Sequence, residues 1–300
     1  MCGIVGLYLK NPSLRSQLGA LFSPMLVAMS ERGPDSAGVA VYRSNDNQPI
    51  KVTVFSDDED EDWARLQTNL SEARFESPKV MPIASHAVVS VSDPAERVRD
   101  WLADQQPHLR IMSSGQSLEI YKEVGLPADV LARFEVPTMS GSHMIGHTRM
   151  ATESAVTTSG AHPFNTGDDL CLVHNGSLSN HNRLRAWLRD KVGVHFQTEN
   201  DSEVAAGYLT WKLAEGLSIA QALEAALTDL DGFYTFAVGT RDGFSVLRDP
   251  IACKPAVMAE TDDWVAMASE FRALSDLPDV SHAKVWEPEP ATVYSWGGQA

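Results

Sequence analysis

The sequence predicts a protein of the α+β class, in which antiparallel sheets pack against pairs of helices. Short apolar runs follow one another at hairpin spacing in the last third of the chain, from residue 233 to residue 294. Helical patterns occur as a pair, over residues 204–213 and 219–230. They do not alternate singly with strands, as helices do in a doubly wound parallel sheet, so α+β is the better prediction.

Length and composition exclude several classes of protein and of binding partner. The 300 residues are 43% hydrophobic, which is enough for a sizeable core. The net charge of −16 disfavours nucleic acid and anionic membranes as partners. Three widely spaced cysteines argue against a disulfide scaffold and for a reducing, cytoplasmic location. No leader and no long apolar run precede or interrupt the chain, so neither secretion nor a membrane span is expected. The nine histidines form no metal-ligand motif, and no metal is expected.

The first strand is predicted over residues 3–7, directly after Cys2. Removal of the initiator methionine would make Cys2 the first residue, with a thiol nucleophile and a free α-amine on one residue. The amine's ordinary pKa of about 7.7–8.0 suits it to accept a proton near neutral pH. The alternative is a buried, inert cysteine in a strand.

The middle of the chain, about residues 44–140, shows no catalytic spacing. We expect it to elaborate a single domain that covers residues 2–300. The six acids at 57–62 predict a solvated loop or, as the alternative, a docking patch for a basic partner. The elements expected before and within this region are helices at 13–21, 24–29, 63–70 and 98–102, strands at 39–42, 51–55, 84–91 and 109–112, and brief helical patterns at 118–124 and 128–134.

Chemistry-bearing residues return after residue 140. A strand over 143–148 ends at Arg149, which suits a carboxylate and could equally form an internal salt bridge. A buried strand then runs into Asn175-Gly176, an ordinary turn signal that would also serve as an oxyanion hole. Asp201 precedes a helix, where it is either a cap or the partner of a substrate ammonium.

Taken together, six segments in order, MCGIVG, RGPDSAG, GHTRMAT, AHPF, HNGSLSN and ENDSE, resemble the class II glutamine amidotransferase domain. The resemblance implies a four-layer αββα sandwich of the N-terminal-nucleophile hydrolases. It also implies that Cys2 attacks the glutamine side-chain amide, that Asn175 and Gly176 stabilise the oxyanion, and that Arg149 and Asp201 bind the α-carboxylate and α-ammonium. Arg32, Thr152 and His162 are expected to complete the substrate site.

Two departures from the family pattern bear on the subfamily. Met150 and Glu153 stand where glucosamine-phosphate-forming members commonly have tryptophan and histidine. The chain looks most like the split amidotransferase subunits of glutamate synthase-like complexes, including N-methylglutamate synthase. That likeness implies a separate synthase subunit with FMN and an iron–sulfur cluster, and no cofactor in this chain. The alternatives are a self-sufficient γ-glutamyl amide hydrolase and a catalytically silent scaffold subunit.

Overall fold

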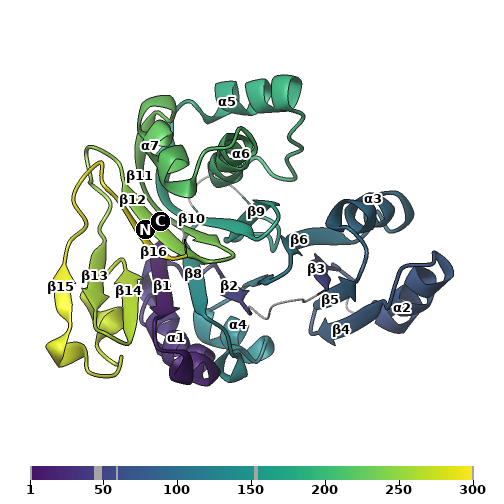
Figure 1. Cartoon of the computed structure of the whole chain (residues 1–300), viewed down its shortest axis with the longest axis horizontal. Coiled ribbons are helices and arrows are strands. Elements are labelled where there is room, and N and C mark those ends of the chain that lie inside the picture. The colour runs from purple at the N-terminus through teal and green to yellow at the C-terminus, as the bar shows by residue number, and fades with distance from the viewer. Residues whose placement is uncertain (1, 44–48, 59, 152–154, 299–300) are drawn as a thin grey trace.

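A computed structural model describes residues 2–43, 49–58, 60–151 and 155–298, and two stacked antiparallel sheets form its centre (Figure 1). The first sheet has seven strands in the order β15 (Lys284–Trp286), β13 (Val257–Glu260), β14 (Trp264–Ala268), β1 (Gly3–Leu9), β8 (His143–Arg149), β2 (Ser36–Tyr42) and β7 (Leu118–Val124). The second has five, in the order β16 (Val293–Gly297), β12 (Gly243–Arg248), β11 (Gly232–Thr240), β10 (Leu170–Leu178) and β9 (Phe164–Gly167).

Helices cover the outer face of each sheet. On the seven-stranded sheet lie α1 (Leu18–Val27) and α4 (Pro127–Arg133), and on the five-stranded sheet lie α5 (His181–Trp187), α6 (Asp201–Ala214) and α7 (Ile219–Asp229) (Figure 1). Short helical segments join the larger elements: 3₁₀ helices at Pro12–Gln17, Ser30–Arg32, Val136–Thr138, Phe271–Leu274 and Val280–His282, and a π-helical segment at Leu188–Val192. The order helix, sheet, sheet, helix confirms the α+β prediction.

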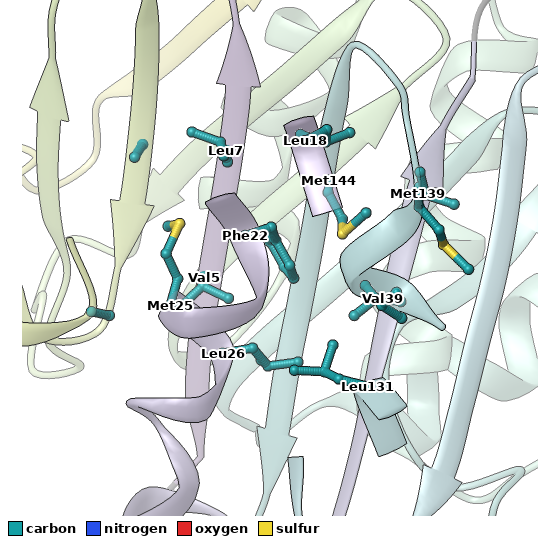
Figure 2. Packing of buried hydrophobic residues seen from close by; sticks show 14 of the residues in the cluster. Val5, Leu7, Leu18, Phe22, Met25, Leu26, Val39, Leu131, Met139 and Met144 are labelled. Atoms are coloured by element: carbon teal, nitrogen blue, oxygen red, sulfur yellow. The ribbon is translucent and has the colours of Figure 1, made fainter. Parts of the chain in front are cut away.

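Three apolar layers hold this sandwich together. Phe22, Met25 and Leu26 of α1 pack on Val5 and Leu7 of β1 under the seven-stranded sheet (Figure 2). A second cluster fills the space between the two sheets, and a third lies between the five-stranded sheet and its helices. Because alternate residues of a strand point to opposite faces, the central strands are apolar on both sides and read as continuous hydrophobic runs.

The elaborated middle region forms a sheet and a core of its own. Strands β3 (Ile50–Phe55), β4 (Lys79–Ile83), β5 (His86–Val91) and β6 (Arg110–Gly115) pair in the order β4-β5-β3-β6, with α2 (Trp63–Glu72) and α3 (Ala95–Gln105) on one face (Figure 1). The chain order β-α-β-β-α-β with this strand order is the split βαβ, ferredoxin-like arrangement. We call residues 50–115 the inserted unit.

Two local predictions were wrong. Residues 118–124 form strand β7 and not a helix, because they pair along their whole length with β2, from Ser36↔Val124 to Tyr42↔Leu118. Pro24 does not begin a helix but lies inside α1, with the Ser23 hydroxyl bonded back to the carbonyl of Gly19 at 2.7 Å. The α1 helix therefore starts at Leu18, six residues before Pro24, where the predicted helix began.

Candidate active site

Cys2 lies one residue before β1, in the middle of the seven-stranded sheet. Gly3 of β1 pairs with Thr148 of β8, next to Arg149. A Cβ on Gly3 would lie 2.7 Å from the Cβ of Met29 and 2.8 Å from the Thr148 hydroxyl, so only glycine fits beside Cys2.

The backbone of Cys2 is held by Arg32. The guanidinium Nε donates to the carbonyl of Cys2 at 3.0 Å, and Nη1 pairs with the carboxylate of Glu270 at 2.7 Å. The hydrogen bond from Arg32 lowers the pKa of Glu270, so that carboxylate stays ionised as the arginine's partner. The structure thus places Arg32 at the carbonyl of Cys2, and its role as a substrate-binding residue stays a prediction.

Arg149 ends β8 and is only 6% exposed. Its Nη1 donates to the carbonyl of Ala155 at 3.3 Å. Asp35 fixes the backbone around it, because the Asp35 amide donates to the Arg149 carbonyl at 3.1 Å and the Asp35 carboxylate accepts from the Ala151 amide at 2.8 Å. The segment 31–38 is therefore tied at Asp35 to the end of β8.

Asn175 and Gly176 lie inside β10 and do not form a turn. A Cβ on Gly176 would lie 2.1 Å from the carbonyl oxygen of Phe233 on β11, and its φ is +157°, so glycine is required here. The Asn175 side-chain amide Nδ2 is buried and has no hydrogen-bond partner among the described residues. A buried donor without a partner is costly unless a ligand satisfies it, as the donor of an oxyanion hole would be satisfied.

Asp201 is the first residue of α6, but it is not the cap. The side chain of Asn200 caps the helix by accepting from the Ser202 amide at 2.9 Å, which leaves the Asp201 carboxylate for other contacts. One carboxylate oxygen accepts from the Leu178 amide at 2.9 Å, at the end of β10. The other lies 3.7 Å from Nδ1 of His174. Asp201 therefore lies beside the strand that carries Asn175.

A buried cluster of three histidines and a serine joins these elements. The Ser202 hydroxyl lies 2.8 Å from Nε2 of His162 and 2.8 Å from Nδ1 of His174, and His147 stacks on His162 with ring centroids 4.0 Å apart. The His147 Nε2–H donates to the carbonyl of His174 at 3.0 Å. This bond ties β8, two residues before Arg149, to β10, one residue before Asn175. The start of β1 after Cys2, the end of β8 at Arg149 and the part of β10 that carries Asn175 are thus joined through β8.

Burial keeps five histidines neutral in the fold. Desolvation is the largest cause in each case and lowers the pKa of His86, His143 and His147 to about 3, and it lowers the pKa of His162 and His174 as well. The unfolded chain binds these protons near pH 6.5, so it holds more protons than the fold between about pH 6.5 and 3. Stability must fall as pH falls through that window.

We expect the urea midpoint to drop between pH 7 and pH 5. For the three histidines with a pKa of about 3, the loss between pH 6.5 and 5 is about 5 kcal/mol. The variant His86→Leu removes one of these histidines, whose ring packs on Phe134 and whose Nε2 has no hydrogen-bond partner among the described residues. Its unfolded state binds one proton fewer, so the urea midpoint of this variant should depend less steeply on pH. A urea midpoint that is constant from pH 7 to pH 5 would contradict the lowered pKa values of these buried histidines.

The other thiols differ from Cys2 in their surroundings. Cys171 is fully buried between the sheets and bonds to the hydroxyl of Tyr42 at 3.2 Å, and burial raises its pKa to about 12. Cys253 is exposed. Among the predicted site residues, Thr152 lies outside the described residues, and His162 lies in the buried cluster. The roles predicted for Cys2, Asn175, Gly176, Arg149 and Asp201 stay predictions, although the fold gathers these residues.

The sequence did not predict the roles of Ser202, Glu270 and Asp35. His147 and His174 were visible only as members of the GHTRMAT and HNGSLSN segments. Within the described residues, no group of three or more histidine, cysteine, aspartate or glutamate side chains is arranged to hold a metal ion, and none of the helices described is both long and apolar enough to span a membrane.

Two stacked antiparallel sheets flanked by helices, with a cysteine at the head of a central strand, define the class of the N-terminal-nucleophile hydrolases. A family model described as a glutamine amidotransferase domain matches residues 147–276. A "Glutamine amidotransferase-like protein GlxB" from Rhizobium meliloti is 60% identical over all of this chain and 99% of its own length. The chain therefore belongs to the class II glutamine amidotransferase family, which confirms the predicted family and enzyme class.

Solved structures support the fold. The allosteric regulatory enzyme of purine biosynthesis is 20% identical and matches 99% of this chain with a TM-score of 0.64. The glutamine phosphoribosylpyrophosphate amidotransferase from B. subtilis is also 20% identical and matches 99% with a TM-score of 0.61. The chain spans 47% and 49% of these two proteins, about half of each. They show that the fold is that of N-terminal-nucleophile amidotransferases.

Proposed function

We propose that this chain hydrolyses the side-chain amide of glutamine or of a γ-glutamyl-alkylamide and passes the ammonia or amine to a separate, flavin-containing synthase subunit. The single observation that carries the hydrolytic half is the buried Nδ2 of Asn175, which has no hydrogen-bond partner among the described residues and lies on a strand that the bond from His147 to His174 ties to the end of β8. A buried donor of this kind supports the proposal, because the oxyanion of the tetrahedral intermediate would satisfy it.

The chemistry follows from the residues gathered there. After removal of Met1, the Cys2 α-amine takes the thiol proton and the sulfur attacks the amide carbon. The negative charge moves to the carbonyl oxygen, which the Asn175 Nδ2–H and the Gly176 N–H stabilise. The amine then gives its proton to the leaving nitrogen, and a thioester forms as ammonia or amine departs. Water, deprotonated by the same amine, attacks the thioester, and glutamate leaves with the thiol restored.

A zwitterionic head group needs one fixed cation and one fixed anion. Arg149 supplies the guanidinium for the α-carboxylate, in the planar, two-pronged geometry that suits that group. Asp201 supplies the carboxylate for the α-ammonium and retains acceptor capacity, because an ionised carboxylate has about four lone-pair sites and the Leu178 amide and the Ser202 hydroxyl use two of them.

Exposed apolar side chains near the site support a partner. Phe271 is 49% exposed and follows Glu270, which pairs with Arg32. Phe233 is 42% exposed and lies opposite Ser177, the residue after Gly176. Large apolar side chains beside a catalytic site suit a surface that a second protein covers, which would also keep released ammonia from water.

The test compares the chain purified alone with the chain purified from its native source. We expect the native chain to co-purify with a flavoprotein, seen by its absorbance, and the complex to release ammonia from glutamine or methylamine from γ-glutamylmethylamide. A colourless, partner-free chain with full turnover would favour the self-sufficient hydrolase. A native complex without turnover, with Cys2 intact, would favour the silent scaffold.

A further inference from the structure

We propose that Lys122 is a positioning residue for the pocket that takes the substrate α-carboxylate, and that it acts by clamping residues 155–163 against Arg149. This inference rests on the proposed function and assigns a role to the elaborated region, in which the sequence shows no catalytic spacing. In this proposal Lys122 does not touch the substrate. It holds residues 155–163 beside Arg149, which binds the substrate α-carboxylate in the proposed function.

The Lys122 ammonium is fully used by one short segment. Its Nζ donates to the carbonyls of Ser159 at 3.2 Å, Ala161 at 2.8 Å and Pro163 at 3.2 Å. An ammonium has three N–H donors, so each donor has one acceptor. The Nζ also lies 4.6 Å from the ring centroid of Phe164, within cation–π range. A single side chain from β7 thus fixes three alternate carbonyls of residues 159–163.

This arrangement costs free energy, because Lys122 is only 4% exposed and no carboxylate of the described residues lies within ion-pair distance of it. Burial lowers the pKa of Lys122 to about 7, and the charge of Glu203 offsets only part of that effect. A buried cation that is matched by carbonyl dipoles alone is expensive, and an apolar side chain would avoid the cost. We infer that this cost is offset because Lys122 fixes the conformation of residues 159–163.

The clamped segment contacts Arg149 at two places. The Nη1 of Arg149 donates to the carbonyl of Ala155 at 3.3 Å. A Cβ built on Gly160 would lie 3.7 Å from the same nitrogen, so the backbone at Gly160 also lies against the guanidinium. A shift of residues 155–163 would therefore change where Arg149 points, even though Lys122 does not contact Arg149 itself.

Two neighbours of Lys122 in the elaborated region hold the same segment. Glu123, next on β7, accepts a short hydrogen bond from the hydroxyl of Thr158. Arg110, on β6 of the inserted unit, donates to the hydroxyl of Ser159. These contacts come from residues that the sequence placed outside the catalytic apparatus. The elaborated region thus braces the wall of the carboxylate pocket, with Lys122 as its central contact.

The test compares Lys122→Met and Lys122→Gln with Lys51→Met. Lys51 is also a buried lysine, but its Nζ pairs with Glu119 at 2.9 Å. Arg149 binds the carboxylate in the ground state and the transition state alike, so its misplacement raises KM more than it lowers kcat. We expect KM for the amide to rise about tenfold in Lys122→Met, less in Lys122→Gln, and not in Lys51→Met, with kcat within about threefold of the wild type.

Equal KM values in the wild type and both Lys122 variants, or an equal rise in Lys51→Met, overturn the proposal. If Lys122→Met does not fold, Lys122→Gln carries the same test, because it keeps donors for two carbonyls.

Hydrogen exchange separates this proposal from the proposed function. The Gly160 amide donates to the Thr157 hydroxyl and the Ala161 amide to the Thr158 carbonyl, so both report the segment's order. Faster exchange there in the Lys122 variants, and not in Lys51→Met, supports the clamp even if no amide is turned over. Unchanged exchange overturns the clamp, whereas absent turnover in the wild type contradicts only the proposed function.

Discussion

Replacing Cys2 by alanine is expected to abolish amide hydrolysis, with a loss of about 10⁴-fold or more in kcat. In the proposed mechanism the thiol forms the covalent bond to the substrate, and no other nucleophile of the described residues shares its place at the head of β1 beside Arg149. The fold should survive, because Cys2 lies outside the strand and is only half-buried. Ammonia release, measured with a coupled assay, tests this directly.

Cys253→Ala is the matched control. This thiol is exposed, while Cys171 is buried with a raised pKa, so neither should contribute to turnover. Full activity in Cys253→Ala and none in Cys2→Ala is the expected pair of results. Residual turnover above about one per cent in Cys2→Ala would mean that another group performs the chemistry.

Replacing Asn175 by alanine is expected to lower kcat by about 10²–10³-fold, with a smaller change in KM. The Nδ2 donor has no hydrogen-bond partner among the described residues, and in the proposed mechanism it bonds to the substrate oxygen most strongly once that oxygen carries negative charge. The stability of the variant should change little through hydrogen bonding, since no bond from this donor is lost on truncation. Steady-state kinetics and urea unfolding check both statements.

Asn180→Ala serves as the control for this second prediction. The Asn180 amide donates to the carbonyl of Asp229 at 2.9 Å and its oxygen accepts from the Asp231 amide, so its loss should reduce stability and leave kcat unchanged. A kcat for Asn175→Ala within about threefold of the wild type would remove Asn175 from the oxyanion hole.

Sequence reasoning succeeded where a short motif carries its own geometry. Cys2 before a glycine-containing strand, Arg149 at a strand end and Asp201 at a helix start are all local patterns, and the fold gathers them as the motif order implied. The central strands could also be predicted from the sequence, because burial on both faces gives them continuous apolar runs.

Sequence reasoning failed where the decisive partner is distant in the chain. Residues 118–124 mix Glu, Tyr and Lys with apolar side chains, and only pairing with β2, about eighty residues earlier, makes them a strand. For the same reason Lys122 gave no signal, since its three carbonyl partners lie 37–41 residues further along. The contacts of Ser202 could not be predicted either, because the two histidines that its hydroxyl contacts come from two other segments of the chain.

The inserted unit shows a related limit. Each of its strands and helices was predicted apart from β4, where Pro82 and exposed side chains obscure the pattern at the sheet edge. The predicted strands nonetheless did not reveal a separate sheet, because strand order depends on pairings such as β5 with β3, which local patterns do not encode.

The central claim is that Cys2, with a free α-amine, is the nucleophile for a glutamine-like amide. The most direct measurement is the intact mass of the protein after treatment with an electrophilic glutamine analogue, followed by peptide mapping. The account predicts a chain without Met1 that carries one adduct, located on Cys2 and absent from Cys2→Ala. Retention of Met1 together with no adduct on Cys2 would contradict it.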